Sequence, residues 1–595
     1  MIRELSELGK KLRSQQAANE WIHDALKLEP ISIELIIDNK GGFQRFELIE
    51  KKSTIAEAIT AKKGKARLLL DKAEEVLCYG GEASKKKHEL FLEKLNEYQD
   101  LSELSPIIAF FKDNKANGID KALKDFEVAI SDEKNRKGNI GFRIQTEGFR
   151  IHEKPRILHE IIAKYETLQK KLLARNQKKC SLCGQSKYPV EDIPHGMIKK
   201  VPDGQSSGCA LVSYNENAFE SYDLKGNSNS SICTNCARTY VEGLNWLLSA
   251  GNEIVIKNKK GNEKNTFRHS NRKNFGSDTA MVFWTRKNKQ LPEIDQLEAP
   301  NPDDVARLID SVSSGTERDN RYLEPDQFYS FTLSGSAARI AVRDCFETSL
   351  YDFRLSIAQW FKDIAITEYD WDLKKLKTHY ARLYDLARSC QRKVSDNSYD
   401  KDDTSLARAA TYLWNAALKN TSLPLWMLEK VLQRARLDKY GVTADRAALI
   451  KIILNRHNKG GDLMISEKNE QGQRPVAYVC GQIFAKLESF QYATLGDRNA
   501  GIRERYFTYA MTLPAAAFGR LFDLHSKHYT KLKSEKPGLA ITLDKELQEL
   551  CKAIDINTLP STFKLEEKGQ FAIGYYHQKQ AQFSSAKTKE KKEEE

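Results

Sequence analysis

The stretch GQSSGCALVSYNENAFESY, residues 204–222, lies between two Cys-x-x-Cys pairs. Two such pairs can supply the four thiolates of a tetrahedral zinc site. The segment between them exceeds the roughly 15–20 residues of compact zinc ribbons, so we expect a ribbon with an insertion. The alternative is four reduced cysteines that fall in pairs by chance. The sequence therefore predicts structural zinc on Cys180, Cys183, Cys233 and Cys236, with Cys209 and His195 expected as a core and a surface residue.

The bracketed stretch is rich in Gly, Ser, Gln and Asn. Glycine lets backbone approach a ligand closely, and the other three donate and accept hydrogen bonds without a fixed charge. Such a surface suits the reading of polar edges, for instance those of nucleic-acid bases, better than it suits acid–base catalysis. A polar turn followed by a strand over 210–214 explains the composition equally well, and both interpretations stay open.

Length and composition bound the class of protein. The chain has 595 residues, which suggests roughly three or four domains. No run reaches the roughly 18 apolar residues of a membrane helix, and the N-terminal MIRELSELGKKLR has no apolar signal segment. Both observations favour the cytoplasm and no membrane. Ten scattered cysteines indicate metal or redox chemistry before disulfides. A net charge of +13 permits a polyanionic partner without proving one.

The predicted fold class is α+β and multidomain: a mixed α/β N-terminal part, an inserted zinc-ribbon-like module and an all-helical C-terminal bundle. Residues 1–175 form the N-terminal α+β region, with helices over 2–12, 66–77 and 157–173 and a hairpin of strands 31–37 and 43–49. The module spans 176–250 with the polar recognition loop. It ends in a helix after Cys236 whose apolar face comprises Tyr240, Val241, Leu244, Leu247 and Leu248.

Residues 251–345 complete the N-terminal α/β domain. Their basic segment can follow a phosphate backbone as a flexible cationic loop, or is simply a solvated loop. Its cations are Lys257, Lys259, Lys260, Lys264, Arg268, Arg272 and Lys273, against Glu263. A strand over 281–285, a mobile acidic linker over 286–326 with prolines at 292, 300 and 302, and strands over 328–333 and 338–342 are expected to follow.

Residues 346–585 are expected to form a helical bundle, helical almost without exception. The clearest helix begins at Pro475 and presents one apolar face as far as Phe490. Thr443 is expected to cap another helix upstream. Arg498, Arg503 and Arg505 lie on a polar segment between helices. The charged tail, 586–595, is predicted to be disordered.

Known catalytic motifs are absent from the sequence. It contains no Walker loop, dinucleotide fingerprint, nucleophile elbow or His-Glu-x-x-His motif. An HNH-like nuclease would need His195 as general base with further ligands, which the segment 192–195 hardly supplies. A deaminase would need a His-x-Glu motif, which is missing. The chain is therefore predicted to bind rather than to catalyse.

Several segments together resemble a known family. GQSSGCALVSYNENAFESY followed by GLNWLL (243–248) is similar to the signature of the large subunit of the type I-C CRISPR surveillance complex, Cascade. Other stretches of the chain are similar to the same family. In chain order they are ARLLLDKAEEVL (66–77), SGSAARIAVRD (334–344), AYVCGQIFAKLESFQYATLG (477–496), RERYFTYAMTLPAAAFGRL (503–521) and FAIGYYHQKQ (571–580). The matches extend to about residue 580.

The resemblance implies a non-catalytic subunit in antiviral defence. Guide RNA pairs with the target strand, while the large subunit reads a short flanking motif, the PAM, in double-stranded DNA. It then helps to open the duplex, holds the displaced strand and recruits a separate helicase-nuclease. The residues expected to read the PAM are Gln205, Ser206, Ser207, Asn215 and Asn217; those expected on nucleic-acid phosphates are Lys199, the basic segment, Arg498 and Arg503.

The resemblance also implies protein partners, namely the backbone subunits of the guide-RNA complex. A small helical subunit made from the same gene, from an internal start at Met464 or Met427, is a further implication. Many members of the family lack the full double cysteine pair, so zinc is expected to be structural. Two rival hypotheses remain: an autonomous metal-dependent HNH-like nuclease, and a zinc-bearing scaffold that touches only protein.

Overall fold

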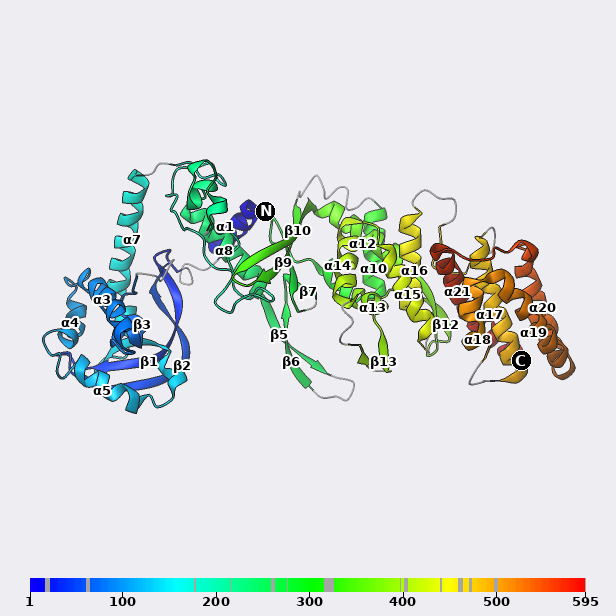
Figure 1. Ribbon diagram of the computed structural model, residues 1–595, viewed down its shortest axis with the longest axis horizontal. Coiled ribbons are helices and arrows are strands. Elements are labelled where there is room, and N and C mark those ends of the chain that lie inside the picture. Colours follow the sequence, from blue (N-terminus) through cyan, green and yellow to red (C-terminus); the bar gives the residue numbers. More distant parts are fainter. Residues whose placement is uncertain are drawn as a thin grey trace. The chain divides into compact units, whose positions relative to one another are not determined.

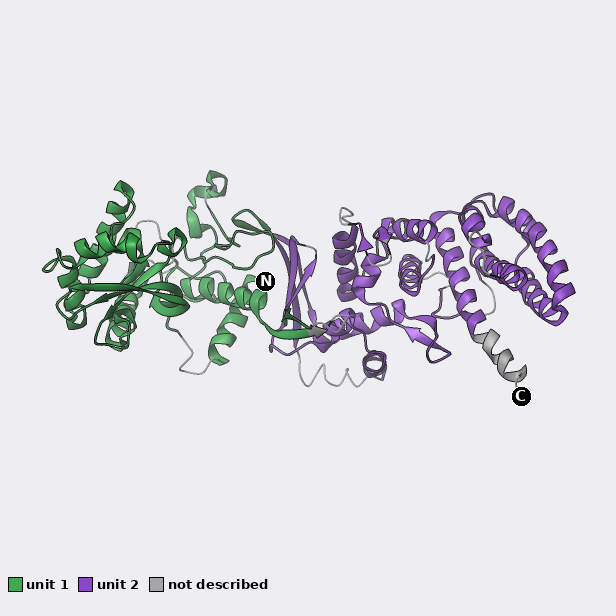
Figure 2. Cartoon of the chain, turned by 90° about the horizontal axis from the view of Figure 1, so that it is seen from below, with its two compact units in different colours: residues 1–270, 335–341 green, residues 271–334, 342–595 purple. Residues whose placement is uncertain are grey.

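The computed structural model describes residues 1–15, 22–59, 65–175, 178–214, 216–257, 263–275, 277–314, 326–395, 398–400, 405–438, 441–458, 464–469, 474–496 and 501–593. The chain divides into two compact units (Figure 2). Unit 1 comprises Met1–Ser270 and Gly335–Ala341; unit 2 comprises Asn271–Ser334 and Val342–Glu595. The predicted boundaries at 175, 250 and 345 do not coincide with this division.

Unit 1 contains, in chain order, α1 (Ile2–Gln15), β1 (Leu26–Ile37), β2 (Phe43–Glu57), β3 (Leu70–Lys72), α2 (Ala73–Val76), α3 (Glu82–Asn96), α4 (Ser105–Phe111), α5 (Ile119–Ala129), α6 (Glu133–Arg136), β4 (Asn139–Ile144), α7 (Pro155–Arg175), α8 (Thr234–Ser249), β5 (Gly251–Lys257) and β6 (Glu263–His269) (Figure 1). The predicted hairpin and the helices over 2–12 and 157–173 are confirmed by β1, β2, α1 and α7.

A four-stranded sheet in the order β2-β1-β4-β3 forms the core of the N-terminal part of unit 1. β1 pairs antiparallel with β2 and parallel with β4. Its apolar residues pack with Phe91 of α3, Phe110 of α4, Phe126 of α5 and Ile157 of α7. The helix predicted over 66–77 is wrong in its first half: Leu70 enters β3 at the sheet edge, and Leu69 has a left-handed φ of 61° that a helix excludes.

Unit 2 contains β7 (Arg272–Phe275), β8 (Thr279–Thr285), α9 (Pro292–Glu298), α10 (Pro302–Ser313), β9 (Gln327–Ser336), β10 (Arg339–Ser349), α12 (Leu350–Ile364), β11 (Ile366–Asp370), β12 (Lys375–His379), α13 (Leu383–Arg388), β13 (Lys393–Ser395), β14 (Ser398–Tyr399), α14 (Ser405–Lys419), α15 (Leu425–Leu437), α16 (Ala444–His457), α17 (Val476–Leu495), α18 (Ile502–Thr512), α19 (Pro514–Glu535), α20 (Pro537–Cys551) and α21 (Leu565–Glu593). The tip of the β9–β10 hairpin groups with unit 1. The strands predicted over 281–285, 328–333 and 338–342 are confirmed.

One continuous apolar core connects the strands of unit 2 with its helices. It extends from Phe275 on β7 through Phe353 on α12 to Tyr576 on α21. Within it α17 and α21 approach closely, because a side chain at Gly481 would meet the backbone of Phe571, and one at Gly574 the backbone of Tyr478. The helix predicted from Pro475 is confirmed by α17, with Pro475 in the capping position before it.

Two predictions for unit 2 need correction. The segment 346–585 is not helical throughout, since β11–β12 and β13–β14 form two antiparallel hairpins within it. The segment 286–326 is not a linker over its described part: Pro292 and Pro302 begin α9 and α10, and Asn301 caps α10. Proline is suited to the first turn of a helix, so these prolines start helices. Residues 315–325 lie outside the described part.

The tail is helical as far as Glu593 within α21, whereas the sequence predicted disorder from residue 586. Its side chains beyond Phe583 lie outside the described residues. The predicted cap at Thr443 is confirmed, because the hydroxyl oxygen of Thr443 accepts a hydrogen bond from the backbone N–H of Arg446 at the start of α16.

Candidate metal centre and nucleic-acid interface

The four predicted cysteines lie together in unit 1. The sulfur atoms of Cys180, Cys183, Cys233 and Cys236 all lie within 4.8 Å of one another. Three of the side chains are buried and Cys183 is half-buried. The first pair is held in a tight turn, in which Gly184 N–H donates to the Cys180 carbonyl at 2.8 Å and Gly184 takes a φ of +69°. Residues 180–183 and 233–236 thus converge from two distant segments.

The donor set fits zinc. Four thiolates in a closed, buried cluster are the ligands of a structural zinc site, which leaves no position for a substrate. The backbone N–H of Cys233 donates to the Cys180 sulfur at 3.3 Å. Hydrogen bonding from Cys233, together with the charge of Lys10, outweighs burial and lowers the pKa of Cys236 to about 5.

The second cysteine pair begins a helix that packs on the N-terminus of the chain. Cys233 caps α8, and α8 crosses α1 (Figure 1) so closely that a side chain at Gly9 would meet the backbone of Thr239. Ser6 and Thr239 hydroxyls lie 2.7 Å apart in the contact. The predicted apolar face is confirmed, with Tyr240, Leu244, Leu247 and Leu248 buried. A metal at the cysteines would therefore fix the helix on which α1 rests.

His195 lies outside the cysteine cluster. Its Nδ1 lies 3.0 Å from the Tyr240 hydroxyl, and burial lowers its pKa. Within the described residues, the four cysteines are the one group of three or more His, Cys, Asp or Glu side chains close enough to hold a metal ion. The arrangement therefore pairs His195 with a tyrosine and not with the further ligands that an HNH-like site would need.

Residues 202–210, here called the recognition loop, are fixed at both ends. Ile198 and Cys209 form an antiparallel bridge, and Gly204 and Ala210 form parallel bridges with Ala337 and Arg339. Gly335 N–H donates to the Pro202 carbonyl at 2.7 Å. The hairpin tip, residues 335–341, thus clamps the loop. The strand predicted over 210–214 is wrong, because Ala210 makes a single bridge and the segment forms no strand.

The apex of the recognition loop is uncharged and exposed. Gln205, Ser206 and Ser207 are exposed, and the turn closes through Gly208, which has a φ of +111°. Cys209 is fully buried, as predicted, beneath the apex. Lys199 is exposed beside the loop, and its backbone N–H donates to Asn245 of α8 at 2.7 Å. The three polar side chains therefore lie at the apex of a loop whose ends are bridged, and Lys199 follows the bridged residue Ile198.

Arg339 is a residue that the sequence reasoning missed. It lies at the hairpin tip, bridged to Ala210, and its guanidinium lies 5.9 Å from the Phe219 ring and 3.7 Å from Glu216. Asn217, which is exposed, begins the short helical turn η3 (Asn217–Phe219) that holds this ring. The motif SGSAARIAVRD contains Arg339, but nothing in the sequence places it beside residues 120 positions upstream. The structure brings the turn that begins at Asn217 and the recognition loop to the same arginine.

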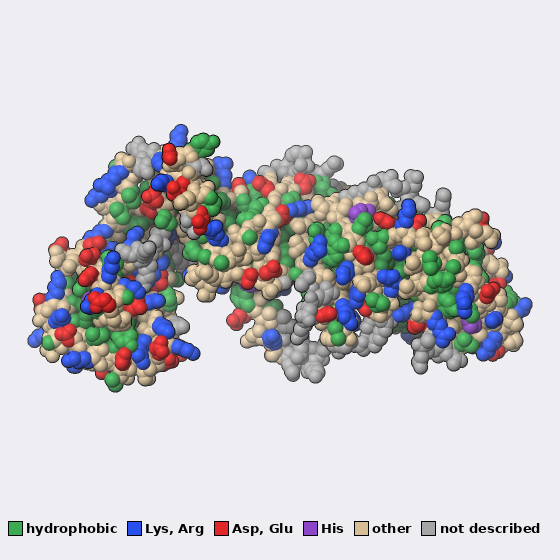
Figure 3. Space-filling view, in the orientation of Figure 1, with side chains coloured by type: hydrophobic (Ala, Val, Ile, Leu, Met, Phe, Trp, Pro, Cys, Tyr) green, Lys and Arg blue, Asp and Glu red, His purple; other side chains and the backbone are tan. Residues whose placement is uncertain are grey.

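Over its described residues the basic segment is mostly strand, namely β6 and the start of β7, and not the predicted loop. β5 and β6 form an antiparallel ribbon that carries exposed Lys264 and Arg268. Lys259, Lys260, Asn215 and Arg498 lie outside the described residues, as does the side chain of Lys257. Lys and Arg side chains are intermixed with Asp and Glu on the face of unit 1 in Figure 3, so the net charge forms no single patch there.

Three predicted phosphate contacts with described side chains lie in unit 2. Lys273 is buried, and its ammonium pairs with Glu298 at 2.7 Å and Asp295 at 3.6 Å. Arg272 is half-buried, and burial lowers its pKa. Arg503, at the start of α18, lies 3.8 Å from Glu504 and packs against Gly441.

Comparison with known proteins supplies the family. No helix in the described part of the chain is both long and apolar enough to cross a bilayer. No curated protein matches the sequence. A family model described as CRISPR-associated protein (Cas_Csd1) matches residues 5–583, which covers both units and the cysteine cluster. The chain therefore belongs to the CRISPR-associated Cas_Csd1 family.

Proposed function

We propose that this chain is the large, non-catalytic subunit of a type I-C CRISPR surveillance complex. In this role it reads the PAM in duplex DNA, promotes opening of the duplex and holds the displaced strand. Its partners are the backbone subunits of the guide-RNA complex, a helicase-nuclease and a small helical subunit, in the cytoplasm. The family match over residues 5–583 is the observation that carries the proposal.

The recognition loop supports the assignment of PAM reading to unit 1. Side-chain amides and hydroxyls can match the donors and acceptors of base edges, whereas cations alone bind phosphates without reading sequence. Gln205, Ser206 and Ser207 are exposed at the apex of a loop whose ends are clamped by the hairpin tip. Such a base spares a ligand the cost of ordering the loop. Lys199 and Arg339 flank it and would position phosphates.

Zinc has a structural part in the proposal. Cys180, Cys183, Cys233 and Cys236 would hold it, and the metal would supply a rigid crosslink between the segment before the recognition loop and α8 after it. Because Asn245 of α8 binds the backbone of Lys199, this crosslink also supports the base of the recognition loop.

The decisive experiment measures duplex binding by the guide-RNA complex, assembled with and without this chain, over a randomised three-base flank. Gln205→Ala is expected to relax discrimination at one flank position by about 1–3 kcal/mol, because one base contact is lost. Gln99→Ala is the matched control, since Gln99 is equally exposed in unit 1 after α3. Binding that needs the chain but ignores the flank would identify a protein scaffold; cleavage by the isolated chain that His195→Ala abolishes would identify a nuclease.

A further inference from the structure

The β5–β6 ribbon is exposed on both faces. β5 and β6 pair only with each other within the described part of the chain, from Gly251↔His269 to Lys257↔Glu263. Val255 and Phe267 are 57% and 45% exposed, so two apolar residues of the ribbon face solvent. An isolated two-stranded hairpin is marginally stable in water and leaves both edges unpaired. Packing in a core therefore does not account for the residues of this ribbon, and a binding partner outside the chain could account for them.

The carboxylates of the ribbon lie on only one of its two faces. Side chains alternate along a strand, and the printed register places Asn252 opposite Arg268 and Ile254 opposite Thr266. One face, here called the cationic face, therefore carries Lys264, Thr266 and Arg268 from β6 with Asn252 and Ile254 from β5. It contains no carboxylate among its described side chains. The opposite face carries both acids of the ribbon, Glu253 and Glu263.

We infer that the cationic face of the β5–β6 ribbon binds the phosphate backbone of a nucleic acid. This inference rests on the proposed function and adds to it the face of the ribbon that makes one contact and the orientation of that contact. Phosphates accept hydrogen bonds from lysine, arginine, threonine and asparagine side chains, which are the polar residues of this face. The carboxylates on the opposite face repel phosphates, so the backbone is held on one side only.

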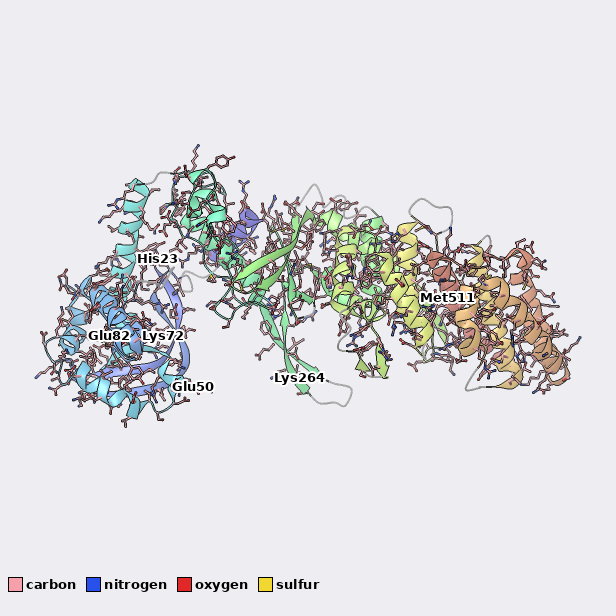
Figure 4. The ribbon with its side chains drawn as sticks, in the orientation of Figure 1. His23, Glu50, Lys72, Glu82, Lys264 and Met511 are labelled. Atoms are coloured by element: carbon pink, nitrogen blue, oxygen red, sulfur yellow. The ribbon has the colours of Figure 1, made fainter. Side chains whose placement is uncertain are left out.

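The dimensions of the ribbon suit this ligand. Lys264 and Arg268 are four residues apart on one strand, which is about 13 Å at roughly 3.3 Å per residue. At an axial rise of about 3.4 Å per nucleotide in one strand of a duplex, that distance corresponds to about four nucleotides along the helix axis. Lys264 lies near the distal end of the ribbon in Figure 4. The strand register places Arg268 opposite Asn252, near the other end of the ribbon. Two cations spaced along the backbone define a direction for the bound strand.

The experiment measures the salt dependence of DNA binding by the complete guide-RNA complex. The variant Lys264→Ala/Arg268→Ala is expected to bind more weakly for every flank alike, and the slope of log K against log [salt] is expected to fall by about two, roughly one per phosphate contact. Lys86→Ala/Lys124→Ala removes the same charge from exposed positions on α3 and α5 and should leave the slope unchanged. Glu253→Gln/Glu263→Gln tests the opposite face and should not lower it.

Three probes distinguish the source of the phosphates: a duplex with the flank only, a matched target, and a matched target without its displaced strand. If the double alanine variant shows a smaller salt slope with the flank duplex alone, the ribbon contacts that duplex. If its slope falls only with the probe that contains the displaced strand, the ribbon contacts the displaced strand. An unchanged slope with all three probes overturns the inference, as does loss of complex assembly in the variant, which would indicate an acidic protein partner. The charge-conserving variant Lys264→Arg/Arg268→Lys keeps both cations on the ribbon. With a folded ribbon it must show the salt slope of the native complex and not that of the double alanine variant. Flank discrimination in the native complex, read from the same titrations, tests the proposed function separately.

Discussion

At the residue scale, His379 of unit 2 shows how two carboxylates control one charge. Its Nε2 lies 2.9 Å from Asp445 at the start of α16, and its Nδ1 lies 3.5 Å from Glu368 on β11. Burial alone would lower the pKa of His379, but the hydrogen bond to Asp445 and the charges of Asp445 and Glu368 outweigh it. The pKa is therefore raised above the ordinary 6.5.

This shift predicts a pH dependence of stability. A histidine whose pKa is raised in the folded state contributes its full stabilisation below its unfolded pKa, and loses it as pH rises through the folded value. The melting temperature of the native chain should therefore exceed that of His379→Gln below pH 6.5, and the difference should shrink at higher pH. Thermal denaturation across this range checks the prediction. Asp445→Asn should show the same loss; a difference that stays constant with pH would contradict the assignment.

At the element scale, the cysteine cluster connects segments that do not touch in sequence. It holds the turn at Cys180 to the first turn of α8, and α8 carries α1. The ion pairs of Arg13 with Asp24 and Glu242 add to this contact at the end of α1. Loss of metal should therefore be felt at the N-terminus of the chain as well as at the cysteines.

The corresponding prediction concerns metal removal. Cys180→Ser should reduce the bound zinc from one ion per chain to none, because three thiolates do not close a structural site. Hydrogen exchange should rise in α8 and α1, while the helices of unit 2 keep their protection. Elemental analysis and hydrogen exchange measure both effects. Cys345→Ser, at an exposed cysteine of β10, is the control. A native chain without zinc and with protected α1 and α8 would refute the metal site.

At the scale of the whole molecule, the C-terminal helices suggest where an internally started subunit would begin. Met427 is fully buried in the first turn of α15, so a chain starting there would lack the capping Pro424. Met464 is 49% exposed between α16 and α17. A start at Met464 leaves α17 to α21 intact, although it uncovers the face of α21 where Gly569 packs against Leu428, Ile450 and Leu454.

We therefore predict that the short product begins at Met464 and folds as a helical unit. Met464→Leu in the full gene should abolish it, whereas Met427→Leu at the internal site should not, and intact-mass measurement of the purified complex identifies the first residue. Circular dichroism of residues 464–595 expressed alone checks the fold. A product that begins at residue 427, or a chain from 464 that remains unfolded, would contradict this boundary.

The sequence predicted those parts of the molecule where local pattern and tertiary environment agree. The α8 face and the four cysteines follow from spacing alone. Residues 66–77 were misread because their leucines fill a sheet edge, an environment that helical spacing does not reveal. The sequence predicts a linker around Pro292 and Pro302, but both prolines begin helices. Arg339 reaches the recognition loop only because a hairpin returns from unit 2, and no local pattern encodes such a return.

The close crossing of α17 and α21 has a consequence for how the chain can evolve. Gly481 and Gly574 each face the backbone of the other helix, at Phe571 and at Tyr478. A larger side chain meeting another side chain can be accommodated by a smaller partner, but one that meets a peptide group cannot. Neither glycine has a compensating mutation available on the opposite helix. The two positions should therefore stay glycine independently, without covariation, in every homologue that keeps this pair of helices.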